Sequence, residues 1–280
     1  MTDLYGESDP TRADELRSGD MNEFEAEFAA PGGASGPLRQ PVGRDLATVS
    51  VVVPTMNEAL NLPYVAARMP AVDEIIVVDG NSIDGTVEVA RELWPSATIV
   101  EQTRSGKGNA LACGFLAATC DIVVMIDADG STDPGEIQDF VDVLLDGADL
   151  AKGSRFSHGG DSEDITALRR LGNKALNSLV NLIFRAEYSD LCYGYNAFWR
   201  ENLPVLDLAD VTAAEAQWGD GFEIETIINV RMIRAGKKIR EVGSFESRRI
   251  HGRSNLNAVS DGLRVLRTIN KERRLQRAAR

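Results

Sequence analysis

The sequence is poor in features that mark exported and membrane-spanning proteins. It has 3 cysteines in 280 residues, without a CxxC pair or the dense, even spacing of a secreted disulfide framework. No apolar run approaches the roughly 18 residues needed to cross a bilayer. The N-terminus has neither a basic start nor an apolar signal core. We therefore expect a protein of the cytoplasm, or of the inner face of the membrane, with no spanning segment.

Positive charge is also scarce, because the formal net charge is -13 at pH 7. This balance disfavours a nucleic acid as the main partner. The segment 258–280 is the exception, since its basic residues outnumber its acidic ones. Leu263, Leu266 and Ile269 recur there at helical spacing, which predicts a basic amphipathic helix. Either the helix packs through its leucines with its arginines solvated, or it lies against anionic lipid.

The remaining chain divides in two. Residues 1–46 carry many acidic and few apolar residues, which predicts a disordered or loosely docked acidic arm. A catalytic domain is expected over 47–257, beginning with the β-branched run VSVVVP. Apolar strand patterns then alternate with helical patterns. The predicted fold is α/β, with a doubly wound, mostly parallel sheet flanked by helices.

Acidic residues follow two of the predicted strands. Asp127 and Asp129 end the apolar run DIVVMI, and Asp79 ends EIIVVD. Ligands of such sheets bind beyond the carboxyl ends of the strands. Two carboxylates separated by one residue can hold a hard divalent cation, although an Asp-rich turn without a metal would show the same sequence pattern. Lys107 precedes a predicted helix whose N-terminal N–H groups could face an anionic ligand.

These motifs occur in a recognisable order. The segments are PTMNE (54–58), VVDGNSIDGT (77–86), RSGKGNAL (104–111), DAD (127–129), GSR (153–155), DLCYGYNAFWR (190–200), the Phe222-Glu223 pair and RRIHGRSNL (248–256). Together they resemble family 2 glycosyltransferases, in particular the dolichyl-phosphate and polyprenyl-phosphate sugar synthases. The resemblance implies a GT-A fold, an inverting reaction, a nucleoside diphosphate sugar as donor and Mg²⁺ or Mn²⁺ as cofactor.

The resemblance also implies roles on the donor side. Pro54, Asn57 and Glu58 would line the nucleoside pocket. Asp79 would hydrogen-bond the base or ribose, and Lys107 would approach the donor near the nucleotide.

The metal and the phosphates have further candidates. By the same resemblance, Asp127 and Asp129 would hold the metal and the diphosphate. Loss of the Asp129 charge should therefore lower turnover. Arg155 would face the reacting phosphates, and Arg253 is a second candidate for a phosphate contact.

The acceptor decides which further residues the reaction needs. A polyprenyl phosphate is largely deprotonated at neutral pH and needs no general base. A hydroxyl of a soluble metabolite or glycan must lose its proton to a carboxylate, for which Asp190 and Glu223 are the candidates. Their alternative roles are a cap or loop hydrogen bond and a solvated helix face. A sugar-nucleotide-binding protein without activity is a third interpretation, against which Asp127, Asp129 and Arg155 argue.

Overall fold

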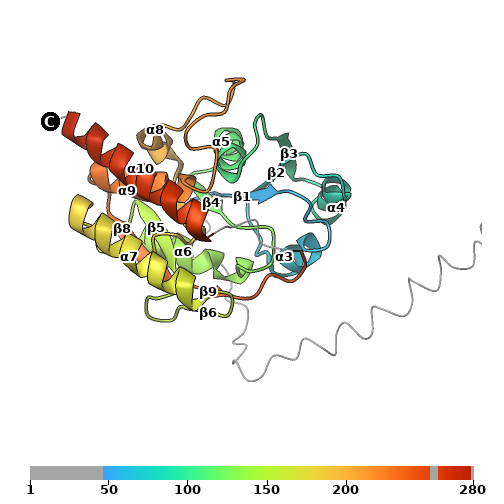
Figure 1. Cartoon of the computed structure of the whole chain (residues 1–280). Coiled ribbons are helices and arrows are strands. Elements are labelled where there is room, and N and C mark those ends of the chain that lie inside the picture. Colours follow the sequence, from blue (N-terminus) through green and yellow to red (C-terminus); the bar gives the residue numbers. More distant parts are fainter. Residues whose placement is uncertain (1–46, 253–257, 279–280) are drawn as a thin grey trace, which may run out of the picture. The chain divides into compact units, whose positions relative to one another are not determined.

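A computed structural model describes residues 47–252 and 258–278 (Figure 1). The predicted acidic arm and Arg253 therefore lie outside the described residues. The main sheet has the strand order β3-β2-β1-β4-β7-β5-β8. Its strands are β1 (Val49–Thr55), β2 (Glu74–Asp79), β3 (Thr98–Glu101), β4 (Ile122–Met125), β5 (Leu150–Ser154), β7 (Asn196–Trp199) and β8 (Ile239–Gly243).

Most neighbouring strands of this sheet are parallel. β1 pairs with β2 and β4, β2 with β3, and β5 with β8 in parallel register, whereas β7 is antiparallel to β4 and β5. The predicted doubly wound, mostly parallel α/β sheet is confirmed. β7 is an element that the sequence pattern did not predict.

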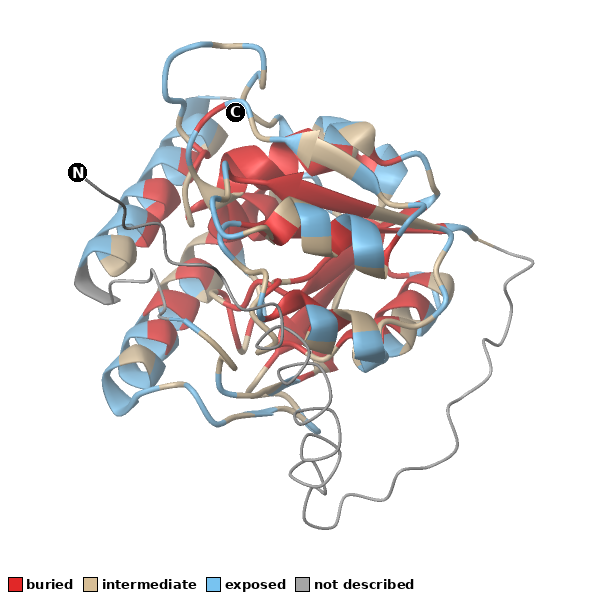
Figure 2. Ribbon diagram, turned by 90° about the vertical axis from the view of Figure 1, so that its right-hand side faces the viewer, coloured by how far each residue is buried: buried red, intermediate tan, exposed pale blue. Residues whose placement is uncertain are grey.

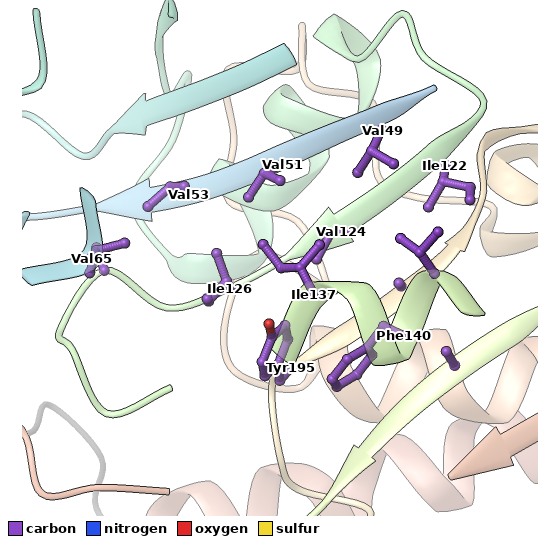
Figure 3. Packing of buried hydrophobic residues seen from close by; sticks show 14 of the residues in the cluster. Val49, Val51, Val53, Val65, Ile122, Val124, Ile126, Ile137, Phe140 and Tyr195 are labelled. Atoms are coloured by element: carbon purple, nitrogen blue, oxygen red, sulfur yellow. The ribbon is translucent and has the colours of Figure 1, made fainter. Parts of the chain in front are cut away.

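Helices cover both faces of the sheet. Alternate β1 residues point to opposite sides, and nearly all of them are buried, so each face needs a covering layer. Val51 and Val53 pack with helices α3 (Leu62–Arg68), α4 (Thr86–Leu93) and α6 (Ile137–Leu145), as Figure 3 shows in part. On the other face, Val52 packs with α5 (Lys107–Ala117), α8 (Leu203–Leu206) and α9 (Ile224–Arg234). Gly114 lets α5 approach closely, since a Cβ there would lie 2.4 Å from Val52 Cγ1. Figure 2 shows the buried sheet between helices with exposed outer faces.

Two longer helices, α7 (Ala167–Phe184) and α10 (Ala258–Ala278), pack beyond α9 (Figure 1). α10 buries Val265 and Ile269, whereas Leu263 and Leu266 are exposed. Glu272 anchors it, because this fully buried carboxylate accepts a hydrogen bond from Arg231 at 2.9 Å. No helix within the described residues is long and apolar enough to cross a membrane.

The loops after β1, β2, β4 and β5 all leave the same edge of the sheet, because these strands run in one direction. Short elements complete this end: η2 (Pro134–Glu136) and the two-stranded sheet of β6 (Asp161–Ser162) and β9 (Phe245–Glu246). The short η3 (Arg200–Asn202) lies at the opposite end, because it follows the antiparallel β7 and its Arg200 N–H donates to the Asp121 carbonyl. The predicted ligand residues after β2 and β4 therefore come together at one edge.

Candidate active site

A pocket of about 730 Å³ opens at this edge of the sheet. One side is polar and formed by the loops after β1, β3 and β4. The other side is formed by the N-terminal halves of α7 and α10. Of the predicted residues, those that line the pocket are Pro54, Glu58, Lys107, Asp127, Asp129 and Arg155.

Lys107 forms ion pairs with two carboxylates on the polar side of the pocket. It is the first residue of α5, and its Nζ lies 2.6 Å from Asp127 Oδ1 and 2.8 Å from Glu225 Oε1. Burial disfavours its charge, but the two carboxylates outweigh this and raise the pKa of Lys107. The lysine is therefore charged and fixed within the pocket.

The N-terminus of α5 itself is not free for a ligand. The N–H groups of Gly108 and Asn109 donate to the carbonyl of Asp220, at 2.8 and 3.2 Å. The predicted anion site at this helix end is therefore reduced to the side chain of Lys107.

Asp129 contacts a second cation. Its Oδ2 lies 2.8 Å from Arg249 Nη2, and Arg249 Nη1 lies 3.0 Å from Glu58 Oε1. The other oxygen, Oδ1, accepts hydrogen bonds from the N–H and Oγ of Ser131, at 2.9 and 2.7 Å. Glu58 is largely buried, and burial raises its pKa against the opposing effects of Asn61 and Arg249.

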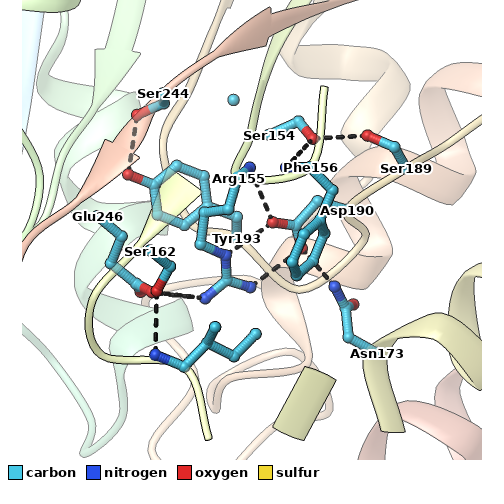
Figure 4. Close-up of polar contacts among 12 residues, drawn as sticks. Ser154, Arg155, Phe156, Ser162, Asn173, Ser189, Asp190, Tyr193, Ser244 and Glu246 are labelled. Atoms are coloured by element: carbon cyan, nitrogen blue, oxygen red, sulfur yellow. Dashed lines mark hydrogen bonds and ion pairs between the residues drawn. The ribbon is translucent and has the colours of Figure 1, made fainter. Parts of the chain in front are cut away.

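Arg155 is held by carboxylates on two sides (Figure 4). Its Nε donates to Asp190 Oδ2 at 2.7 Å, and its Nη1 donates to Glu246 at 3.0 Å. Its guanidinium also lies over the Tyr193 ring, 4.9 Å from the centroid. Burial would raise the pKa of Asp190, but the hydrogen bonds and charge of Arg155 lower it overall.

Asn57 and Asp79 connect the loops after β1 and β2. Asn57 adopts a positive φ of 59°; its side chain accepts from the Ile83 N–H, and its own N–H donates to Ser82 Oγ. Asp79 is buried and accepts from the Ser82 N–H through Oδ2. Its Oδ1 has no hydrogen-bond partner among the described residues. Oδ1 is buried, and neither Asn57 nor Asp79 lines the pocket.

The two predicted base candidates do not line the pocket. Asp190 lies behind Arg155, and Glu223 accepts from the Gly219 N–H at the start of α9. Glu225, two residues later, lines the pocket instead. Residues two apart on a helix point to nearly opposite sides, so only one of these two carboxylates can face the ligand. Sequence analysis did not single out Glu225.

The fit to a divalent metal can be judged from the donor atoms. The described residues contain no group of three His, Cys, Asp or Glu side chains arranged for a metal ion. Asp127 and Asp129 alone suit an ion such as Mg²⁺, which typically takes one or two carboxylates plus substrate phosphates. The site therefore fits a metal that arrives with a diphosphate.

Comparisons with known proteins agree with this arrangement. The family model described as Glycosyl transferase family 2 matches residues 50–204. The chain is 34% identical over 225 residues to a polyprenol monophosphomannose synthase of Mycolicibacterium smegmatis, covering 74% of this chain and 82% of that protein. It is 28% identical over 227 residues to a dolichyl-phosphate hexose transferase of Haloferax volcanii, covering 80% and 92%.

A solved structure shares the architecture. A glucosyl-3-phosphoglycerate synthase from Mycobacterium tuberculosis, crystallised with Mn²⁺, UDP-glucose and phosphoglyceric acid, has a TM-score of 0.64 and 24% identity. The likeness covers 88% of this chain and 86% of that one. At this identity it shows the fold alone, and the predicted GT-A fold is confirmed.

Proposed function

The chain belongs to glycosyltransferase family 2 and is a glycosyltransferase, and from this premise we propose that it transfers a sugar from a nucleoside diphosphate to a polyprenyl phosphate. The proposed reaction inverts the anomeric carbon and requires Mg²⁺ or Mn²⁺. The names of the two relatives support this acceptor class, since one is a polyprenol monophosphomannose synthase and the other a dolichyl-phosphate hexose transferase.

The donor is assigned to the polar side of the pocket. Pro54 and Glu58 would line the nucleoside. Asp127 and Asp129 would hold the metal against the diphosphate. A bound divalent ion would neutralise charge that develops on the leaving diphosphate. Asn57 and Asp79 would support this side indirectly, through the loops that they join.

The acceptor proposal rests on one observation, the pairing of the pocket's carboxylates. Each carboxylate of the described residues that lines the pocket lies between 2.6 and 3.9 Å from a lysine or arginine nitrogen. They are Glu58, Asp127, Asp129, Asp164, Glu225, Glu246 and Asp261. A carboxylate that faces a cation is poorly placed to accept a proton from a hydroxyl. An acceptor that arrives as a phosphate anion needs no such base.

The apolar side of the pocket suits the lipid chain of the acceptor. Leu168 and Leu176 of α7 and Val265 of α10 line it. Leu168 is also 65% exposed, and Leu171 and Leu182 on the same helix are 68% and 81% exposed. The apolar lining thus continues onto the surface of α7.

We extend the proposal to a peripheral contact of this surface with anionic lipid. Basic residues accompany the exposed leucines on both helices, namely Arg169, Arg170, Lys174, Arg264, Arg267, Lys271, Arg273 and Arg274. Basic side chains near an anionic membrane contribute about 1 kcal/mol each, and leucines insert between headgroups. Of the two interpretations of α10, the packed helix accounts for Val265 and Ile269, and the lipid contact accounts for Leu263 and Leu266.

The test compares two acceptors that differ only in the phosphate. UDP- and GDP-linked sugars are screened with Mn²⁺ for thermal stabilisation of the protein, and the best donor is offered to polyprenyl phosphate and to polyprenol. We expect a product from polyprenyl phosphate alone, with inverted anomeric configuration by NMR. Transfer to hydroxyl acceptors but not to polyprenyl phosphate would contradict the proposal. Glu225, whose pKa is raised by burial, would then be the base to examine.

A further inference from the structure

Cations of the chain itself contact both predicted metal ligands. Lys107 Nζ lies beside Asp127, and Arg249 Nη2 lies beside Asp129. The two cations are held differently. Each also contacts a second carboxylate, Glu225 for Lys107 and Glu58 for Arg249, but Lys107 belongs to a helix, whereas Arg249 lies in the segment that follows β9. A positive charge therefore already occupies the position next to each carboxylate.

The two carboxylates are not equally open to a metal ion. Asp127 is 31% exposed at its side chain, and its side-chain contact among the described residues is made through Oδ1. Asp129 is 14% exposed, and both of its oxygens have partners, Oδ1 in Ser131 and Oδ2 in Arg249. An ion that binds Asp129 must displace one of these partners. Arg249 is the one that a cation would repel.

We propose that Arg249 is an internal counter-cation of the metal site, which it keeps closed to the free metal ion until a nucleotide binds. The inference rests on the proposed function. A metal ion alone would have to displace a guanidinium that stabilises both Asp129 and Glu58. A nucleoside diphosphate offers Arg249 new oxygens, since guanidinium groups bind phosphate through strong charge-assisted hydrogen bonds. Metal and nucleotide then bind with positive coupling, and each raises the affinity for the other by the same factor.

The backbone around Arg249 is fixed, so a movement of its side chain is sufficient. The Ser247 N–H donates to the carbonyl of Ser131 at 2.8 Å. The His251 N–H donates to Asn61 Oδ1 at 2.9 Å, and Asn61 Nδ2 donates to the His251 carbonyl at 3.2 Å. None of these bonds uses the Arg249 side chain. Substitution of the guanidinium should therefore leave the segment in place.

The test measures Mn²⁺ binding to the full chain without nucleotide, using the electron paramagnetic resonance signal of free Mn²⁺. Arg249→Gln should bind Mn²⁺ about tenfold more tightly than the wild type, which corresponds to about 1.4 kcal/mol. Arg249→Lys keeps the charge and should stay nearer to the wild type. Arg248→Gln is the matched control, because this neighbouring arginine lines the same pocket without a described ion pair. Removal of its charge should change Mn²⁺ affinity much less.

The same titration with UDP or GDP measures the coupling. Nucleotide should raise the Mn²⁺ affinity of the wild type strongly and that of Arg249→Gln less. Unchanged or weaker Mn²⁺ binding by folded Arg249→Gln, or an equal gain in Arg248→Gln, would overturn the counter-cation role while leaving the proposed function intact. Absence of Mn²⁺ binding by the wild type, even with nucleotide, would overturn both.

Discussion

Asp190 offers a test of whether the carboxylate beside Arg155 positions the arginine or takes a proton. It is fully buried and accepts hydrogen bonds from Arg155 Nε at 2.7 Å, Arg155 Nη2 at 3.0 Å and Asn173 at 2.7 Å. Asp190→Asn keeps the shape but removes the charge. Loss of one partner from a buried ion pair costs about 3–5 kcal/mol. Because Glu246 still neutralises Arg155, we expect the lower end, about 3 kcal/mol.

For a domain of this size, that loss should lower Tm by about 6–12 °C. Thermal unfolding followed by circular dichroism measures it. Turnover should fall because Arg155 is less well held, and the double variant Arg155→Gln with Asp190→Asn should be little worse than Arg155→Gln alone. The reasoning is refuted if Asp190→Asn melts like the wild type yet loses about 10²–10⁴-fold in turnover, together with the acidic limb of its pH profile. That result would identify a general base.

Three further predictions concern the metal, the partly buried Glu136 and the lipid surface. Asp129→Asn should lower turnover by about 10²-fold or more, and full activity of the wild type in EDTA would exclude a metal. Burial raises the pKa of Glu136 to about 7 from its ordinary 4.5. Between these pH values the folded state therefore binds more protons than the unfolded state. Stability should therefore fall as pH rises between these values, and Glu136→Gln should flatten that part of a denaturant-unfolding profile. Leu171→Asp should weaken co-sedimentation with anionic vesicles about tenfold, whereas Leu116→Asp, equally exposed on α5, should not. Binding that is insensitive to Leu171 and to salt would contradict the lipid surface.

Local patterns were sufficient to predict most of the fold. β1, β2 and β4 are buried runs of apolar residues, and such runs are visible without knowledge of their neighbours. Gly236 follows the last turn of α9, and it has a φ of 72° and donates to the Ile233 carbonyl, as a glycine that ends a helix does. β7 was missed because NAFW is short and has no strand pattern. Its place between β4 and β5 depends on pairing with distant segments, which local propensity does not contain.

Less of the candidate site could be predicted from the sequence. The segments that carry Asp127, Asp129 and Lys107 could be placed at one edge, since strands that alternate with helices are parallel and ligands bind beyond their carboxyl ends. The ion-pair partners of these residues could not be predicted. Glu225 lies 118 positions from Lys107, and Arg249 lies 191 positions from Glu58. No spacing rule connects residues so far apart in the chain.

These distant ion pairs set the charge of the pocket. Among the described residues, seven carboxylates and five basic side chains line it, which gives a formal charge of -2, although the whole chain carries -13. One divalent cation would cancel that charge. A nucleoside diphosphate that enters alone adds negative charge to an already negative pocket, whereas one that enters with a metal ion does not. Because the interior of a protein screens charge poorly, this difference favours joint binding of metal and nucleotide. Under the proposed function, the cations thus stabilise the carboxylates of the pocket, and a divalent metal ion would supply the remaining positive charge.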